Sequence, residues 1–160
     1  MKFIDKIIEI NKIEETLEPI RDKKIVFTNG CFDILHRGHV EYLSKSAELG
    51  DILVIGLNSD DSIRRIKGLN RPIQNQENRS IILAAFEFVN YVVIFNEDTP
   101  YELIKKVIPN VLVKGSDYKI ENIVGRDIVE SNGGEVCTID LIDGQSTTNI
   151  INIINKLNNT

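Results

Sequence analysis

Apolar and polar positions alternate along this chain in blocks that predict strands and helices in turn. A continuous apolar run of the kind found in strands covered on both faces occurs at 52–57, and further strands are predicted at 25–28, 91–95, 111–113 and 135–139. Between these strands, apolar residues recur at helical spacing, and we expect helices over about 38–49, 60–66, 78–86, 99–108, 121–131 and 149–157. Such βα alternation predicts an α/β, three-layer Rossmann-like fold, with a parallel sheet of about five strands flanked by helices.

The same pattern predicts a single domain covering residues 1–160. Residues 1–22 are expected to form an amphipathic helical lead-in, and 24–157 the core that carries the chemistry. Residues 67–76 have no periodicity and include Gly68 and Pro72, which indicates a loop. Gly50 follows a predicted helix and is expected to adopt a left-handed cap conformation.

Composition narrows the class of protein. Apolar residues make up 42% and charged residues 27%, as in an ordinary globular domain. The net charge of −5 argues against nucleic acid as a partner, although a local cationic pocket for a nucleotide remains compatible with it. Cys31 and Cys137 have neither zinc-ligand spacing nor a disulfide framework, so we expect reduced thiols. Charges within the apolar positions of the N-terminal segment predict neither a signal peptide nor a membrane anchor, and we expect a cytoplasmic protein.

The segment 24–39 (KIVFTNGCFDILHRGH) contains the strongest chemical signal. A short apolar strand leads through a turn at Gly30 into a helix that opens on His36 and His39, the only two histidines. Positions three apart share a helical face, so both imidazoles can contact the same ligand beyond the strand's carboxyl end. Backbone amides at a helix N-terminus favour anions there. Because the dinucleotide and P-loop fingerprints are both absent, this turn is the predicted polyphosphate site.

Asn29-Gly30-Cys31-Phe32-Asp33 followed by His36-x-Gly-His39 resembles the opening signature of the cytidylyltransferase-like nucleotidyltransferases. The resemblance continues over most of 24–157. Its further blocks are similar to the adenylyltransferase part of the enzymes that make ADP-heptose from heptose 1-phosphate and ATP: Asn58-Ser59-Asp60, Arg71-Pro72, Glu77-Asn78-Arg79, Asp98-Thr99-Pro100, Val113-Lys114-Gly115-Ser116-Asp117-Tyr118 and Ser146-Thr147-Thr148-Asn149-Ile150-Ile151. In many bacteria that part is fused behind a sugar kinase. Arg37 and Gln74-Asn75-Gln76 depart from the expected pattern.

The resemblance implies a role for each matching residue. His36 and His39 would contact the triphosphate and stabilise the transition state, and Lys67 would close over the phosphates. Nucleotide binding would involve Thr28, Asn29, Gly30, Cys31, Phe32, Ser146, Thr147 and Thr148 in addition to the two histidines. Acceptor binding would involve Asp33, Arg79, Lys114 and Asp117.

Ordinary structural roles compete with several of these assignments. Asp33 could cap an Asx-type turn, and Ser146, Thr147 and Thr148 could simply cap a helix. Lys67 could be a solvated lysine and Arg79 half of a surface ion pair. Lys114 and Asp117 could belong to a plain turn at the end of a strand. A nucleophilic Cys31 is disfavoured because no base other than the phosphate-facing histidines adjoins it.

A sugar 1-phosphate is largely ionised near pH 7, since its second pKa is about 6, so it needs no general base. Catalysis should therefore consist of positioning and electrostatic stabilisation, without a covalent intermediate. Mg²⁺ is expected to arrive with ATP, needing no protein cage. Two alternatives are a cytidylyltransferase for a small alcohol phosphate such as glycerol 3-phosphate, and a non-catalytic nucleotide-binding subunit. We also expect a homodimer or higher oligomer, with 86–91 or the last helix at the interface.

Overall fold

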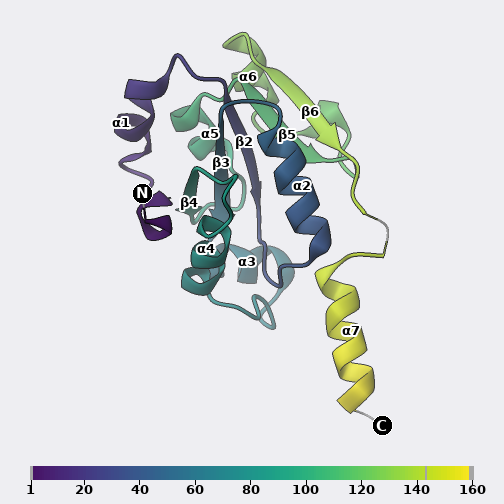
Figure 1. Cartoon of the computed structure of the whole chain (residues 1–160). Helices are drawn as coiled ribbons and strands as arrows, with labels where there is room; N and C mark the ends of the chain where they lie inside the picture. Colours follow the sequence, from purple (N-terminus) through teal and green to yellow (C-terminus); the bar gives the residue numbers. More distant parts are fainter. Residues whose placement is uncertain (1, 143, 159–160) are drawn as a thin grey trace.

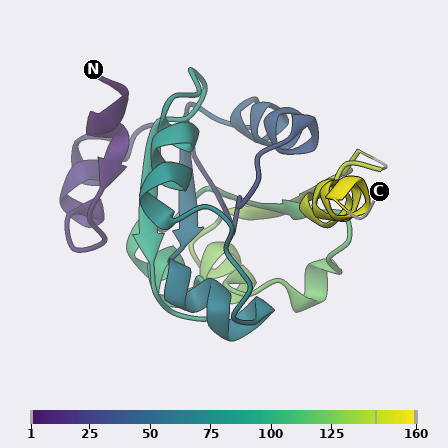
Figure 2. The same cartoon turned by 90° about the horizontal axis from the view of Figure 1, so that it is seen from below.

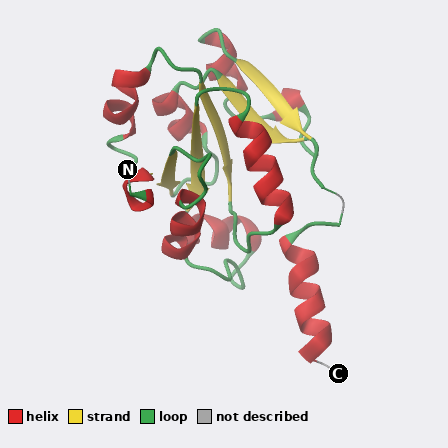
Figure 3. Ribbon diagram, in the orientation of Figure 1, coloured by secondary structure: helices red, strands yellow, loops and turns green. Residues whose placement is uncertain are grey.

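A computed structural model describes residues 2–142 and 144–158. Six parallel strands form one sheet in the order β1-β4-β3-β2-β5-β6. The elements, in chain order, are η1 (Phe3–Lys6), β1 (Ile7–Ile8), α1 (Ile13–Leu17), η2 (Glu18–Ile20), β2 (Ile25–Gly30), α2 (Arg37–Ala47), β3 (Ile52–Asn58), α3 (Asp60–Lys67), α4 (Gln76–Ala84), β4 (Tyr91–Phe95), α5 (Tyr101–Val107), β5 (Val111–Gly115), η3 (Ile120–Asn122), α6 (Arg126–Ser131), β6 (Glu135–Ile139) and α7 (Thr147–Asn158). The predicted three-layer Rossmann-like architecture is confirmed (Figures 1 and 3).

Helices cover both faces of the sheet because successive strand residues point to opposite sides. Ile25 and Phe27 of β2 belong to a buried cluster with residues of α1, α5 and α6. Val26, between them, belongs to a second cluster with α2 and α4. Such two-sided burial explains why 52–57 is a continuous apolar run rather than an alternating one.

The N-terminal segment departs from the expected lead-in helix. Two short helical pieces flank β1, whose residues Ile7 and Ile8 pair with Val92 and Val93 of β4 and add a sixth strand at the sheet edge. Ile13 and Leu17, four apart on α1, are both fully buried. Figure 2 shows this segment and α7 on opposite sides of the domain. A two-residue strand has too little pattern to be predicted from sequence, and its pairing depends on the exposed edge of β4.

Gly50 does not adopt the left-handed conformation that we expected. It is not among the glycines with positive φ. Instead, a Cβ at this position would lie 2.5 Å from the Lys24 carbonyl oxygen and 2.7 Å from Val26 Cγ2. The glycine is therefore required by the close approach of the chain to the start of β2.

The segment 86–91, a predicted oligomer surface, carries two aromatic rings. Phe86 and Phe88 stack with their centroids 5.3 Å apart, and Lys6 Nζ donates to the Phe86 carbonyl at 2.9 Å. The N-terminal segment thus contacts this surface within the same chain. The oligomeric state stays a prediction. None of the described helices is long and apolar enough to span a bilayer.

Candidate active site

The strand order reverses its direction at β2, and a cleft opens there. β2 is followed by β3 and β4 on one side, whereas β5 and β6 lie on its other side. In open α/β sheets such a switch point, at the carboxyl ends of the strands, is where ligands bind. Asn29 and Gly30 from the end of β2, and Lys114 and Gly115 from the end of β5, line a cleft of about 800 Å³. The predicted site therefore lies at the switch point.

The turn after β2 is shaped by its aromatic residue. Phe32 has φ of 45°, a left-handed conformation that is uncommon for a bulky residue, and its side chain is buried. Its ring meets the His39 ring edge-on at a centroid distance of 5.5 Å. A Cβ on Gly30 would come within 3.1 Å of the Phe32 ring. The Phe32 ring therefore packs between Gly30 of the turn and the His39 ring.

The two histidines lie side by side at the N-terminus of α2. His36 is the N-cap residue, and its ring stacks on that of His39 with centroids 3.9 Å apart. Both line the cleft, and both Nδ1 atoms are buried without a hydrogen-bond partner among the described residues. A Cβ on the intervening Gly38 would lie 3.0 Å from the His36 ring, so glycine is needed for this packing. Both rings line the cleft side by side, so together they can contact one ligand there.

Both imidazoles are held neutral in the ligand-free cleft. Burial lowers the pKa of His36. The pKa of His39 falls to about 4, first because the ring is buried and then because His36 and Lys67 add positive charge nearby. Neutral rings act as hydrogen-bond donors without the cost of burying two adjacent cations. An arriving polyanion would shift both groups back toward the charged form.

Thr28 supports the site from behind rather than lining the cleft. Its hydroxyl is fully buried and lies 2.7 Å from the Tyr42 hydroxyl of α2. Tyr42 in turn donates to the Val113 carbonyl of β5 at 3.2 Å. Burial raises the pKa of Tyr42, so this hydroxyl stays protonated. The predicted nucleotide contact at Thr28 is therefore replaced by a bridge that joins β2, α2 and β5.

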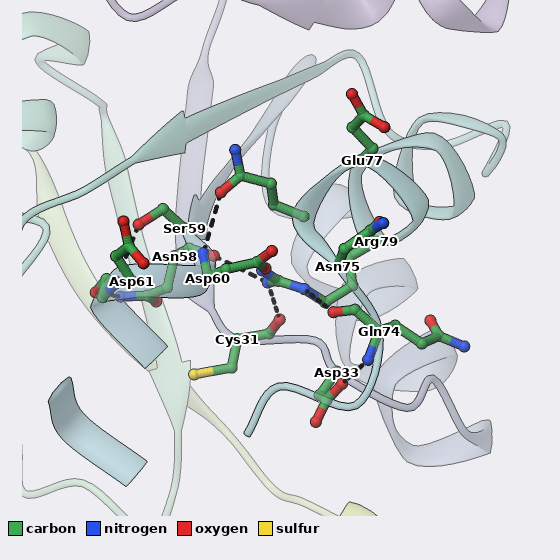
Figure 4. A network of polar contacts seen from close by, with 12 residues as sticks. Cys31, Asp33, Asn58, Ser59, Asp60, Asp61, Gln74, Asn75, Glu77 and Arg79 are labelled. Atoms are coloured by element: carbon green, nitrogen blue, oxygen red, sulfur yellow. Dashed lines mark hydrogen bonds and ion pairs between the residues drawn. The ribbon is translucent and has the colours of Figure 1, made fainter. Parts of the chain in front are cut away.

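Arg79 also lies outside the cleft lining. Its side chain is fully buried, and it donates to the carbonyls of Gln74 at 2.9 Å, Cys31 at 2.7 Å and Asn58 at 2.9 Å. The guanidinium also pairs with the Asp60 carboxylate at 2.7 Å (Figure 4). All of these acceptors belong to the protein. Arg79 is thus placed to hold the turn after β2 and the end of β3, rather than to meet substrate or form the surface ion pair considered from sequence.

Asp33 lines the cleft but has its carboxylate occupied. It accepts from Arg71 Nε at 2.8 Å and from the backbone amides of Ile73 at 2.9 Å and Gln74 at 2.8 Å. These bonds link the turn after β2 to the loop between α3 and α4 (Figure 4 shows Asp33 and Gln74). A turn cap within its own segment does not describe this geometry, and the acceptor-binding role stays a prediction.

Lys114, Asp117 and Tyr118 form the opposite wall at the end of β5. Lys114 Nζ lies 3.5 Å from the Asn29 carbonyl oxygen and 5.1 Å from the Tyr118 ring centroid. Burial lowers the pKa of Lys114 to about 8, partly opposed by the charge of Asp117. A Cβ on Gly115 would lie 2.5 Å from Asp117 Oδ1, which explains the glycine between them. An anion bound here would stabilise the charged lysine.

The first turn of α7 closes another side of the cleft. Ser146 Oγ accepts from the Asn149 amide at 3.0 Å, and Thr147 Oγ1 donates to the Ile34 carbonyl at 3.3 Å. Ser146, Thr147 and Thr148 all line the cleft. Helix capping and exposure to a ligand therefore coexist at these residues, as the sequence had allowed.

Lys67 and Cys31 face the same space. Lys67, the last residue of α3, lines the cleft, and its charge contributes to lowering the pKa of His39. Burial raises the pKa of the Cys31 thiol, although Lys67, Arg79 and Arg71 oppose this. A thiol held protonated is a poor nucleophile, in line with the expectation that Cys31 does not act as one.

Some cleft residues had no role assigned from sequence. They include Tyr42, Asn58, Ile66, Arg71, Asp98 and Gln145. Asn58, Arg71 and Asp98 belong to blocks that carry the family resemblance, which was the one available signal. The two departures from the family pattern lie outside the cleft: Arg37 pairs with Glu41 at 2.6 Å in solvent, and Asn75 caps α4 by accepting from the Asn78 amide at 2.9 Å.

Comparison with known proteins agrees with this geometry. The cytidylyltransferase-like family model matches residues 27–152, a span that includes the turn after β2, both histidines and the first turn of α7. A nucleotidyltransferase-type fold with its cleft at the switch point is the class that these observations define. The chain belongs to the cytidylyltransferase-like family.

Individual relatives make the match more specific. The chain is 60% identical over 135 residues to the bifunctional protein HldE of Syntrophotalea carbinolica, and 54% identical over 157 residues to that of Campylobacter concisus. These matches cover 84% and 98% of this chain but only 28% and 32% of the relatives, so the chain spans less than a third of their length.

Solved structures include related folds. A lipopolysaccharide core biosynthesis protein from Thermoplasma volcanium has a TM-score of 0.62 and 27% identity, covering 77% of this chain and 99% of that one. A pantoate-beta-alanine ligase from Francisella tularensis has a TM-score of 0.58 at 15% identity, covering 96% of this chain and 78% of that one, and shares the fold alone.

Proposed function

We propose that this chain transfers AMP from ATP to a heptose 1-phosphate, giving ADP-heptose and pyrophosphate. The identity to bifunctional HldE proteins and the resemblance over 24–157 support this substrate pair. The observation that carries the chemistry is the pair of stacked imidazoles, whose ring centroids lie 3.9 Å apart in the lining of the cleft.

In the proposed reaction an oxygen of the sugar phosphate attacks the α-phosphorus of ATP. A new P–O bond forms, the bond to the bridging oxygen of the β-phosphate breaks, and its electron pair leaves on pyrophosphate. His36 and His39 donate hydrogen bonds to the phosphate tail on which negative charge increases. Donors already oriented in a partly buried site lower the barrier because they need no reorganisation during the reaction.

The other walls of the cleft supply the remaining positioning. The first turn of α7 and Lys67 would hold the triphosphate, with hydroxyls and helix amides on one side and a cation on the other. Lys114 would bind the acceptor phosphate as a point charge, beside Asp117 as an acceptor for sugar hydroxyls. Neither reactant needs to be deprotonated by the protein.

Mg²⁺ would enter with ATP. Residues 2–142 and 144–158 contain no group of three or more His, Cys, Asp or Glu side chains placed to hold a metal ion. The ion would then be coordinated mainly by phosphate oxygens and water, as Mg²⁺ commonly is with nucleotides. It would supply charge neutralisation on the phosphates.

A matrix assay tests the proposal: each nucleoside triphosphate is incubated with a panel of sugar and alcohol phosphates, and pyrophosphate release is measured. We expect ATP with heptose 1-phosphate to be the most active pair. Activity confined to CTP with glycerol 3-phosphate would overturn it in favour of a cytidylyltransferase. Nucleotide binding without pyrophosphate release for any pair would indicate a non-catalytic subunit.

A further inference from the structure

Arg71 is a cation of the cleft that has no role in the proposed reaction. It lies in the loop between α3 and α4, lines the cleft together with Lys67, and exposes only 17% of its side chain. Three non-helical residues, 68–70, separate it from Lys67, so the two cations approach the site from the same segment. A mostly buried guanidinium at a ligand cleft calls for a specific partner.

Asp33 is a partner for one edge of this guanidinium. Its carboxylate, only 1% exposed, accepts from Arg71 Nε at 2.8 Å and from the amides of Ile73 and Gln74. The same carboxylate therefore holds both the side chain of Arg71 and the backbone that follows it. Because the guanidinium is planar, a bond at Nε restricts the directions in which its terminal nitrogens can point.

The terminal nitrogens of Arg71 have no acceptor among residues 2–142 and 144–158. Among the contacts of the described residues, Nε is the one nitrogen of this side chain with a protein acceptor. Arg79 offers a contrast, because its guanidinium is fully enclosed and satisfied by four protein acceptors. All three nitrogens of the Arg79 guanidinium thus donate to protein acceptors, whereas the two terminal nitrogens of Arg71 have no acceptor among the described contacts and lie at the cleft.

We propose that Arg71 is a phosphate-binding residue of this cleft and that Asp33 is the positioning residue that orients it. The proposal rests on the proposed function in so far as both reactants carry phosphate. A planar fork with free terminal N–H groups matches phosphate oxygens in a bidentate manner. The shared ligand chemistry is a phosphate group, supplied either by the triphosphate or by the acceptor.

Arg71→Gln tests the ligand contact, with Arg126→Gln as the matched control. Arg126 lies on α6, pairs with Glu130 in solvent and is not part of the cleft. Isothermal titration with Mg·ATP and, separately, with heptose 1-phosphate should show Kd raised about tenfold to a hundredfold for one ligand, the loss expected for a charge-assisted bond. The ligand affected identifies the phosphate. Arg71→Lys, which keeps the charge but loses the fork, should fall between.

Asp33→Asn tests the positioning role. It should weaken binding of the same ligand. In the Arg71→Gln background it should raise Kd by a smaller factor than it does alone, because both substitutions disrupt the same contact between Asp33 and Arg71. If the contact between Asp33 and Arg71 only stabilises the fold, Asp33→Asn and Arg71→Gln should both lower the melting temperature. The Kd values for Mg·ATP and for heptose 1-phosphate should then stay within twofold of the wild type. That outcome would overturn the proposal. If Arg71→Gln does not fold, Arg71→Lys carries the test with the same criterion.

Phosphate binding by Arg71 and AMP transfer to heptose 1-phosphate can be disproved independently. Titration measures binding without turnover, so a protein that binds Mg·ATP more weakly after Arg71→Gln but makes no ADP-heptose would disprove only the proposed reaction. Normal ADP-heptose synthesis by a variant with unchanged Kd and KM for both substrates would disprove only the role of Arg71.

Discussion

Two helices, α2 and α7, bring their N-termini to the same cleft, but they are anchored very differently. α2 packs Tyr42 and Leu43 into the core beneath His36 and His39. α7 has no buried residue among those described, and it projects away from the sheet in Figure 1. Its first turn is tied to the domain through the Thr147 hydroxyl and the Ile34 carbonyl. The histidine end of the site is therefore fixed by the core, whereas the hydroxyl end depends on a few polar contacts.

The largest expected effect falls at the fixed end. His39→Ala should lower kcat for pyrophosphate release on the order of 10²–10³-fold, by analogy with the loss of one oxyanion-hole donor. Folding should survive, because the ring is at the cleft rather than in the core. Steady-state kinetics together with a melting curve measure both quantities. Arg37→Ala, on the same helical turn but paired with Glu41 in solvent, is the control and should stay within twofold. Near-normal turnover in His39→Ala would remove the histidines from the mechanism.

The difference in anchoring can be measured directly as stability. Leu43→Ala on α2 should lower the free energy of unfolding by about 2–5 kcal/mol, since it opens a cavity at a fully buried position. Ile153→Ala on α7, where the side chain is 58% exposed, should change it by less than about 0.5 kcal/mol. Urea denaturation of both variants checks this. Equal losses would mean that α7 is buried against a surface outside the described contacts.

The wall formed by Lys114 predicts a dependence on pH. With a pKa lowered to about 8, the free lysine is charged below that pH and neutral above it. Phosphate binding favours the charged form, so affinity for the sugar phosphate should be nearly constant around pH 7, fall about twofold by pH 8 and then fall toward tenfold per pH unit above that. KM for the acceptor measured from pH 7 to 9.5 tests this. Lys114→Arg, which stays charged, should give a flat profile, and a flat wild-type profile would contradict the assignment.

The smallest effect is expected at the loosely anchored end. Thr147→Val removes one hydroxyl and its 3.3 Å bond to the Ile34 carbonyl. Loss of a single neutral hydrogen bond of about 1 kcal/mol should raise KM for ATP roughly fivefold, with little change in kcat. Thr16→Val, which removes a hydroxyl bonded to Lys12 on α1, is the matched control. A decrease in kcat/KM as large as that of His39→Ala would show that the first turn of α7 contributes as much as the histidines of α2.

The comparison of Arg79 with Lys114 shows how far sequence carried the site. Both were assigned to acceptor binding through the same resemblance, Arg79 within a predicted helix and Lys114 after a predicted strand. The structure places Lys114 at the cleft and Arg79 in the interior, where backbone carbonyls from three separate segments surround it. Carbonyl acceptors leave no trace in residue identity, so no sequence pattern distinguished the two. Asp33 was ambiguous for the same reason, since two of its partners are backbone amides.

The chain's own pattern determined the class of fold, the five longer strands and the turn with its two histidines. These depend on local periodicity and on short-range spacing, which are written directly in the residue order. Only the tertiary structure decided that β1 completes the sheet, that Thr28 and Arg79 support the site from within, and that Asp33 holds Arg71. Each of these results from contacts between segments far apart in the chain. Their partners are chosen by packing and by the need to satisfy buried polar groups, and neither is visible until the strands are in place.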